Sequence, residues 1–192
     1  VFLHFPGLKV AMPSDASDAA GLLRTAIRDD NPVMFFEHKA LYTSKCEVDD
    51  SPDFSVPFGK ARILREGTDV TIIATHTYVQ KSLNVAEKLA AEGISAEVID
   101  PRTLVPMDWD AMAASVEKTG RAVVVHEAHR TGGVGAEIAA ELSERTFRYL
   151  DSPILRLGAK SCPLPFNLGL ENAVVPQESD IYAACKRALY QA

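Results

Sequence analysis

The pattern of apolar and polar residues at the start of the chain predicts an amphipathic helix followed at once by a buried strand. Asp15 and Asp18 have capping-box spacing and are expected to begin the helix. Its apolar stripe, with spacings of three and four residues, consists of Ala19, Leu22, Leu23, Ala26 and Ile27. Pro32 cannot continue the helix, and the apolar run at 33–36 predicts a strand. A helix that leads directly into a buried strand indicates half of a βαβ unit.

From residue 61 onward, short apolar runs alternate with helical stripes. The runs predict strands at 61–65, 70–74, 96–99, 122–125 and 154–157. The stripes predict four helices. The first covers about 78–92, and the second begins after the N-cap Asp108. The third runs from Gly135 as far as Tyr149 and Leu150, and the last follows Ser179, which is expected to be its cap. This alternation predicts an α/β fold with three layers, αβα, around a mostly parallel five-stranded sheet.

The segment between the two patterned regions has no periodicity. It is acidic and contains Pro52 and Pro57, which is typical of an interdomain linker. The predicted division is therefore residues 1–44, a linker at 45–60, and a second domain at 61–192. Since few residues precede Ser14, the strand expected before the first helix is barely present, and residues 1–44 are expected to be the carboxyl-terminal remnant of another α/β domain.

Composition narrows the class of protein. With 192 residues and 47% hydrophobic content, the chain is long enough for a packed domain and part of another. The formal charge of −6 argues against a general nucleic-acid surface and permits a basic protein partner. No apolar run approaches the ~18 residues that a membrane span needs. Three separated cysteines indicate neither a disulfide framework nor a metal site, so we expect an intracellular protein.

Polar residues follow three of the predicted strands, at the edge where parallel sheets gather functional groups. They are His76, the pair Asp100 and Arg102, and the segment 126–129. The histidines of this segment have i, i+3 spacing, whereas a zincin helix needs i, i+4, and the glycines at 132–135 satisfy no nucleotide-binding motif. His38 is interpreted as a structural histidine. No catalytic or cofactor-binding residue can therefore be assigned from these patterns.

The end of the first helix is a candidate metal site. Carbonyl oxygens of Ala26 and Ile27, together with the side-chain oxygens of Asp29 and Asn31, could surround a hard cation, because the last helical turn leaves carbonyls unpaired and carries the negative end of the dipole. The residue types alone favour the alternative, a solvated helix stop before Pro32.

A series of short segments runs in collinear order over essentially the whole chain. The segments are 6–10, 12–14, 26–33, 37–42, 57–61, 66–71, 100–104, 106–108, 119–121, 126–128 and 163–166. Together they resemble the β subunit of the thiamine-diphosphate-dependent 2-oxo acid dehydrogenases, and residues 61–192 resemble the transketolase C-terminal domain. The stretch from Ala26 to Pro32 and the sequence His126-Glu127-Ala128 favour this family over its relatives.

The resemblance implies an α2β2 enzyme that decarboxylates a 2-oxo acid on thiamine diphosphate and acylates lipoyl groups reductively. The cofactor carries the chemistry. The glutamate, aromatic residue and histidine that the β subunit supplies in this family have no match here, and the Gly-Asp-Gly motif that holds magnesium and diphosphate belongs to the α subunit. The chain is therefore expected to be part of a β subunit and to be inactive alone.

The resemblance also implies further partners and one ion. In pyruvate-type relatives, the segment that matches Ala26, Ile27, Asp29 and Asn31 binds a structural potassium ion. The expected protein partners are the α subunit, a second β subunit and the basic subunit-binding domain of the dihydrolipoyl acyltransferase. The expected location is the cytoplasm for a bacterial-type enzyme or the mitochondrial matrix.

Alternatives remain open at this point. A C-terminal domain of transketolase or deoxyxylulose-phosphate synthase would share the fold and the cofactor. A non-catalytic assembly or ligand-sensing module would belong to a different class and would bind a small regulator at the strand ends. Pyruvate, branched-chain 2-oxo acids and acetoin all remain candidate substrates.

Overall fold

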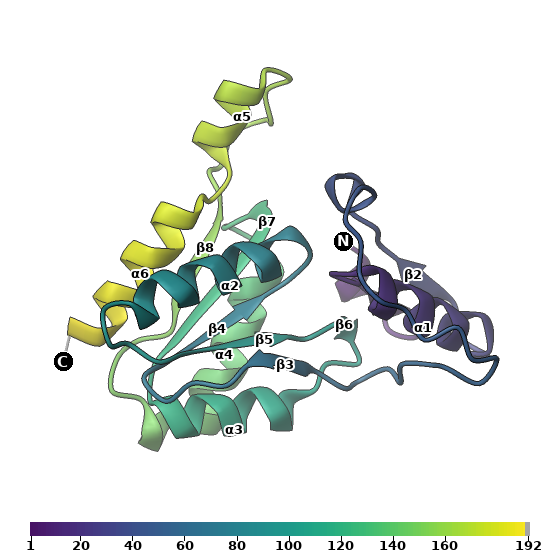
Figure 1. The fold of residues 1–192 in the computed structure, drawn as a ribbon, viewed down its shortest axis with the longest axis horizontal. Coiled ribbons are helices and arrows are strands. Elements are labelled where there is room, and N and C mark those ends of the chain that lie inside the picture. The colour runs from purple at the N-terminus through teal and green to yellow at the C-terminus, as the bar shows by residue number, and fades with distance from the viewer. Residues whose placement is uncertain (191–192) are drawn as a thin grey trace.

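The computed structural model describes residues 1–190 and contains two sheets joined by an extended segment (Figure 1). The smaller sheet has the order β2-β1-β6. Strand β1 (Lys9–Ala11) pairs in parallel with β2 (Val33–Phe35), and helix α1 (Ala16–Ile27) connects them. A three-residue strand therefore does precede the first helix and completes a βαβ unit. The third strand, β6 (Thr103–Val105), comes from the second half of the chain and pairs antiparallel with β1.

The larger sheet confirms the predicted fold class. Its five strands have the order β3-β5-β4-β7-β8, and every pair is parallel except the edge pair of β3 and β5. The strands are β3 (Arg62–Arg65), β4 (Val70–Ala74), β5 (Ala96–Asp100), β7 (Ala122–His129) and β8 (Leu155–Ala159). The central strands β4 and β5 are buried throughout, which explains their continuous apolar runs.

Helices cover both faces of this sheet. One face packs against α2 (Thr77–Ala90) and α6 (Glu178–Tyr190), and the other against α3 (Trp109–Thr119) and α4 (Val134–Thr146). The first core centres on Ile72 and Val98, and the second on Ile73 and Val124. Adjacent residues of one strand thus point into different cores, as the alternation of side chains along a strand requires. No helix in residues 1–190 has the length and apolarity needed to cross a bilayer.

The structure differs from the sequence pattern in the carboxyl-terminal third. Helix α4 ends at Thr146 and continues as a 3-10 turn, Phe147–Tyr149, so Tyr149 is 54% exposed rather than part of the inner stripe. Ser179 lies inside α6, because the helix begins one residue earlier, at Glu178. The pattern also missed the short helix α5 (Leu168–Val174), which projects from the body (Figure 1).

Candidate functional site at the junction of the two sheets

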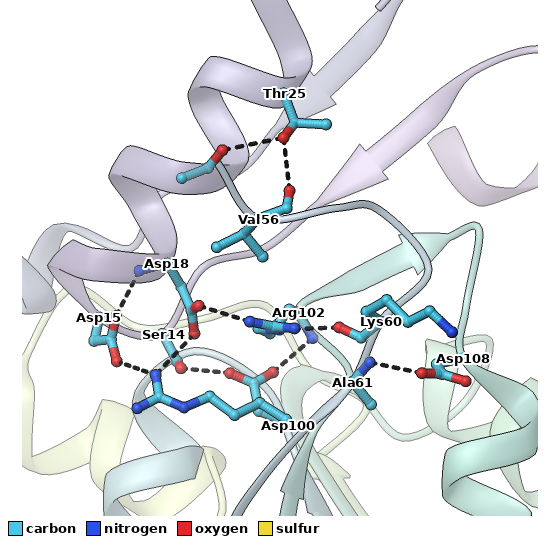
Figure 2. Close-up of polar contacts among 12 residues, drawn as sticks. Ser14, Asp15, Asp18, Thr25, Val56, Lys60, Ala61, Asp100, Arg102 and Asp108 are labelled. Atoms are coloured by element: carbon cyan, nitrogen blue, oxygen red, sulfur yellow. Dashed lines mark hydrogen bonds and ion pairs between the residues drawn. The ribbon is translucent and has the colours of Figure 1, made fainter. Parts of the chain in front are cut away.

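The start of α1 meets the end of β5 in a network of charged side chains, of which Asp18 and Asp100 are buried (Figure 2). Asp15 is the N-cap of α1, and its carboxylate accepts a hydrogen bond of 2.7 Å from the N–H group of Asp18. Asp18 is only 3% exposed, and its two oxygens accept from Arg102 Nη1 at 3.0 Å and from Arg62 Nη1 at 3.3 Å. The same Arg62 group reaches Asp15 at 2.9 Å. Two arginines that follow the linker in the sequence thus compensate the acidic helix start.

Asp100 lies directly beside this network and is fully buried. Its carboxyl accepts hydrogen bonds from the hydroxyl of Ser14 and, at 2.8 Å, from the N–H of Arg102 (Figure 2). Burial raises the pKa of Asp100 to about 7, and the negative charge of Asp18 acts in the same direction, whereas the two hydrogen bonds oppose the shift. A carboxyl group in this state can change its charge near neutral pH.

Arg102 holds several of these groups together through an unusual backbone conformation. Its φ of 58° is left-handed, which a non-glycine residue adopts only at a local energetic cost. Its backbone N–H then reaches Asp100, while its guanidinium contacts Asp18 and the carbonyl of Lys60 at 2.9 Å. The sequence pattern placed Asp100 and Arg102 at a strand end but did not show that α1 would supply their partners.

The predicted linker is fixed along the side of α1. Arg24 Nη1 donates to the carbonyl of Ser51 at 2.7 Å. The hydroxyl of Thr25 donates to the carbonyl of Val56 at 2.6 Å (Figure 2). The Val56 side chain, 6% exposed, packs on Gly21, where any Cβ atom would lie 2.4 Å from Val56 Cγ2. The glycine is therefore required for this close approach.

A second polar group lies in a cavity of about 500 Å³ at the carboxyl ends of β4 and β7. His38 Nε2 lies 3.0 Å from Glu127 Oε2, and His76 Nε2 donates to the carbonyl of Phe36 at 2.9 Å. The rings of His38 and His76 meet edge to face, with centroids 5.6 Å apart. Burial lowers the pKa of both His76 and His126, so these imidazoles are neutral near pH 7. The polar residues expected at the strand ends therefore separate into two groups: Asp100 and Arg102 lie at the charged junction, and His76 and His126 lie in this cavity.

The predicted cation ligands lie at the end of α1, as expected from their positions, and Lys9 is an additional residue beside them. Asp29 Oδ2 pairs with the ammonium group of Lys9, and Oδ1 accepts from the backbone and side chain of Asn31 at 2.9 and 3.0 Å. The Lys9 and Asn31 hydrogen bonds lower the pKa of Asp29 to about 2. The Ala26 carbonyl accepts from the Asp29 N–H at 3.3 Å, and Ile27 is the last residue of the helix.

This donor set consists of oxygens and so has the chemistry that a hard cation requires. Lys9 was not anticipated as a partner, and its ammonium group already compensates one oxygen of Asp29. Within residues 1–190, no three side chains of His, Cys, Asp or Glu gather as a metal site. Any cation here would therefore depend largely on backbone carbonyls and Asn31.

Known protein families match both parts of this arrangement. The model of the transketolase C-terminal domain matches residues 59–181, and that of the transketolase pyrimidine-binding domain matches residues 1–45. The chain belongs to the transketolase C-terminal domain family. The charged junction therefore connects a transketolase C-terminal domain with a segment of the pyrimidine-binding type.

Relatives of this transketolase-family chain are similar over nearly its whole length. Pyruvate dehydrogenase E1 component subunit beta-2, mitochondrial, from Oryza sativa subsp. japonica is 47% identical over 100% of the chain and 52% of the relative. Pyruvate dehydrogenase E1 component subunit beta from Staphylococcus epidermidis is 47% identical over 98% of the chain and 58% of the relative. The chain thus spans about half the length of these relatives. The resemblance drawn from the sequence motifs is confirmed.

A solved structure supports the same relationship. The split gene transketolase, described as an inactive beta4 tetramer, has a TM-score of 0.77 and 28% sequence identity. The match covers 98% of this chain and 59% of that one. The transketolase-like fold expected from the sequence is therefore confirmed.

Proposed function

We propose that this chain is part of the β subunit of a 2-oxo acid dehydrogenase that acts on pyruvate. The enzyme decarboxylates its substrate oxidatively and acylates the lipoyl groups of an acyltransferase. The observation that carries the proposal is the collinear similarity, at 47% identity over 98–100% of the chain, to proteins named pyruvate dehydrogenase E1 subunit beta. The identity to the transketolase of known structure is lower, 28%, so a dehydrogenase is favoured over a transketolase.

In this proposal the chain serves assembly rather than chemistry. Thiamine diphosphate, held with magnesium in the complete enzyme, supplies an ylid and an electron sink. No residue of this chain is assigned to that cofactor. The junction formed by Asp18, Asp100, Arg62 and Arg102 instead fixes the C-terminal domain against the pyrimidine-type segment. The proposed partners are an α subunit and a second β subunit, and the proposed location is the cytoplasm or the mitochondrial matrix.

The test is a calorimetric titration of magnesium thiamine diphosphate into the chain alone, and then into the chain mixed with a pyruvate dehydrogenase α subunit. Light scattering of the mixture reports whether the two chains associate. We expect association with the α subunit and no cofactor binding by the chain alone. Micromolar binding by the isolated chain, about −8 kcal/mol, would contradict the assignment of the chain to assembly, and failure to associate would contradict the assignment to a dehydrogenase.

We further propose that the end of α1 binds a structural potassium ion through Ala26, Ile27, Asp29 and Asn31. The oxygen donors and the low pKa of Asp29 support this, although Lys9 competes for one carboxylate oxygen. The test is the melting temperature in potassium chloride and in choline chloride at equal ionic strength. Potassium should raise the melting temperature of the parent and of Asp30→Asn but not of Asp29→Asn. An equal response of all three would contradict the site.

The acyltransferase partner is proposed on the ground of charge. The chain has a net charge of −6, which suits a basic subunit-binding domain. If this is correct, the affinity for such a domain should fall steeply between low and physiological salt, because opposite surface charges are screened by ions. Binding that does not depend on salt would contradict an electrostatic docking surface.

A further inference from the structure

The loop that opens α4 lies directly on a buried histidine of β7. His126 is 3% exposed, and neither of its ring nitrogens has a hydrogen-bond partner within residues 1–190. The backbone of Ala128 is near the ring but lacks hydrogen-bond geometry. A Cβ atom at Gly133 would lie 2.5 Å from His126 Cε1, and one at Gly135 would lie 2.7 Å from Nε2. Both glycines therefore permit the helix start to rest on the imidazole.

The helix start carries unpaired donors at the same place. Helix α4 has 13 residues, and its N-cap, Gly133, provides no capping side chain. The first paired amide is that of Ala136, which donates to the Gly133 carbonyl at 3.0 Å. In the part of the chain that the structure describes, the amides of Val134 and Gly135 have no acceptor, and Gly135 is buried. Unpaired buried polar groups are costly, so the Gly135 N–H group favours an acceptor from outside the chain, and the half-buried N–H group of Val134 lies beside it.

The electrostatic surroundings favour an anion at this position. The positive end of the α4 dipole points toward it. Burial is the main cause of the lowered pKa of His126, and the positive charge of the nearby Arg156 on β8 lowers it further. The two carboxylates of the cavity already have partners. Glu127 pairs with His38 at 3.0 Å, and Glu37 accepts from the Tyr42 hydroxyl at 3.0 Å.

We propose that His126 and the start of α4 form a binding site for a small organic anion. Its carboxylate accepts hydrogen bonds from the N–H groups of Val134 and Gly135 and from the neutral imidazole of His126. This site involves neither the charged junction nor the end of α1, and it does not depend on the function proposed above.

The walls of the cavity indicate an organic anion rather than inorganic phosphate. The cavity of about 500 Å³ extends from His126 and Gly133 to apolar side chains contributed by four separate segments. These are Met12, Phe36, Leu104 and Leu164. A carboxylic acid with a short alkyl chain places its charge at the helix start and its carbon atoms against these residues, whereas phosphate has no apolar part to bury.

The test uses sodium butyrate as the probe and follows the backbone amides and the His126 ring of the 192-residue chain by NMR. Butyrate should produce saturable shifts at Val134, Gly135 and His126. Butyramide, which has the same shape without the charge, should produce none, and phosphate should bind at least fivefold more weakly than butyrate. Absence of a saturable response to butyrate, or an equal response to butyramide, would overturn the site. Tighter binding of phosphate would overturn the assignment to an organic anion.

A pair of variants separates binding from folding. Val134→Pro removes one proposed donor, yet proline suits the first position of a helix, and the φ and ψ of Gly133, −80° and 160°, are compatible with a following proline. Val134→Ala removes the same side chain but keeps the N–H group. We expect Val134→Pro to weaken butyrate binding at least fivefold relative to Val134→Ala, with both variants showing the parent pattern of amide resonances elsewhere. Equal affinities of two folded variants would overturn the proposal.

Discussion

Asp18 and Arg102 form an ion pair of 3.0 Å although 84 residues separate them in the sequence. Both side chains are nearly enclosed, with exposures of 4% and 13%. Asp18 belongs to the helix of the small sheet and Arg102 to the connection between β5 and β6. The pair therefore joins the two parts of the chain through charges that neither part could bury alone.

Replacement of Asp18 by asparagine should destabilise the protein. It leaves the enclosed guanidinium of Arg102 without its anion, and loss of one partner of a buried pair costs about 3 kcal/mol. Urea unfolding of the parent and of Asp18→Asn measures the difference. Asp110→Asn is the matched control, since Asp110 likewise pairs with an arginine, at 3.3 Å, but is 96% exposed. Equal midpoints for the parent and Asp18→Asn would show that the pair does not stabilise the junction.

Asp100 should make stability fall as pH rises from about 4 to 7. Its folded pKa of about 7 lies above the usual value near 4, so the folded state binds the extra proton in that range, and the advantage is lost as the group ionises. Above pH 7 the effect should level off. The slope from this one group is at most about 1.4 kcal/mol per pH unit.

The comparison with Asp100→Asn isolates this effect. Asparagine can keep the contacts to Ser14 and Arg102 but does not titrate. His76 and His126, whose lowered pKa values act in the opposite sense by reducing stability as pH falls, remain in both proteins. The stability of the parent relative to the variant should therefore decline between pH 5 and about 7. A difference that is constant with pH would contradict the raised pKa.

Gly21→Ala should loosen the segment 45–60. The new Cβ atom would lie 2.4 Å from Val56 Cγ2, so either the helix or the linker must move, at a cost of about 1–3 kcal/mol. Proteolysis in the linker should become faster. Val56→Ala creates space at the same point, so the double variant should be more stable than the sum of the single effects predicts. Strict additivity would show that the two residues do not press on each other.

The three cysteines should differ sharply in reactivity. Cys46 and Cys162 are exposed, whereas Cys185 is buried in α6, and burial raises the pKa of its thiol to about 12. The thiolate is the reactive form. A thiol reagent at pH 8 should modify Cys46 and Cys162 in the folded protein and reach Cys185 only after unfolding. Rapid native modification of Cys185, identified by mass spectrometry, would contradict the packing of α6.

The sequence pattern predicted best where local chemistry alone decides the structure. Strand 70–74 has the bounds expected from its apolar run, and Asp15 caps α1 at the expected position by accepting from the N–H of Asp18. Helix α5 was missed because it has only seven residues and no buried side chain, so Leu168 and Leu170 give no stripe directed at a core. Ser179 suits a cap, but the neighbouring Glu178 pairs with Lys88 and is already helical.

The candidate site was predictable only in part, because its partners come from distant segments. The patterns identified Asp100, Arg102, His126 and Asp29 as residues of interest. They could not show that Ser14 reaches Asp100, that Lys9 reaches Asp29, or that the helix after Gly133 rests on His126. The first contact depends on how the two sheets meet, and the other two depend on how α1 and α4 pack beside the strands of their own sheets, which no local period encodes.

The pairing of β6 with β1 has a consequence for how this protein can be divided. The strand Thr103–Val105 lies within the sequence of the C-terminal domain but completes the other sheet. If residues 61–192 were produced alone, β6 would have lost its partner β1 and would expose an unpaired strand edge. If residues 1–60 were produced alone, β1 would expose the edge that β6 normally covers. Such edges pair readily with strands of other molecules. Neither piece should remain monomeric, so evolution can exchange or fuse these parts only where the interlocking strand is exchanged with them.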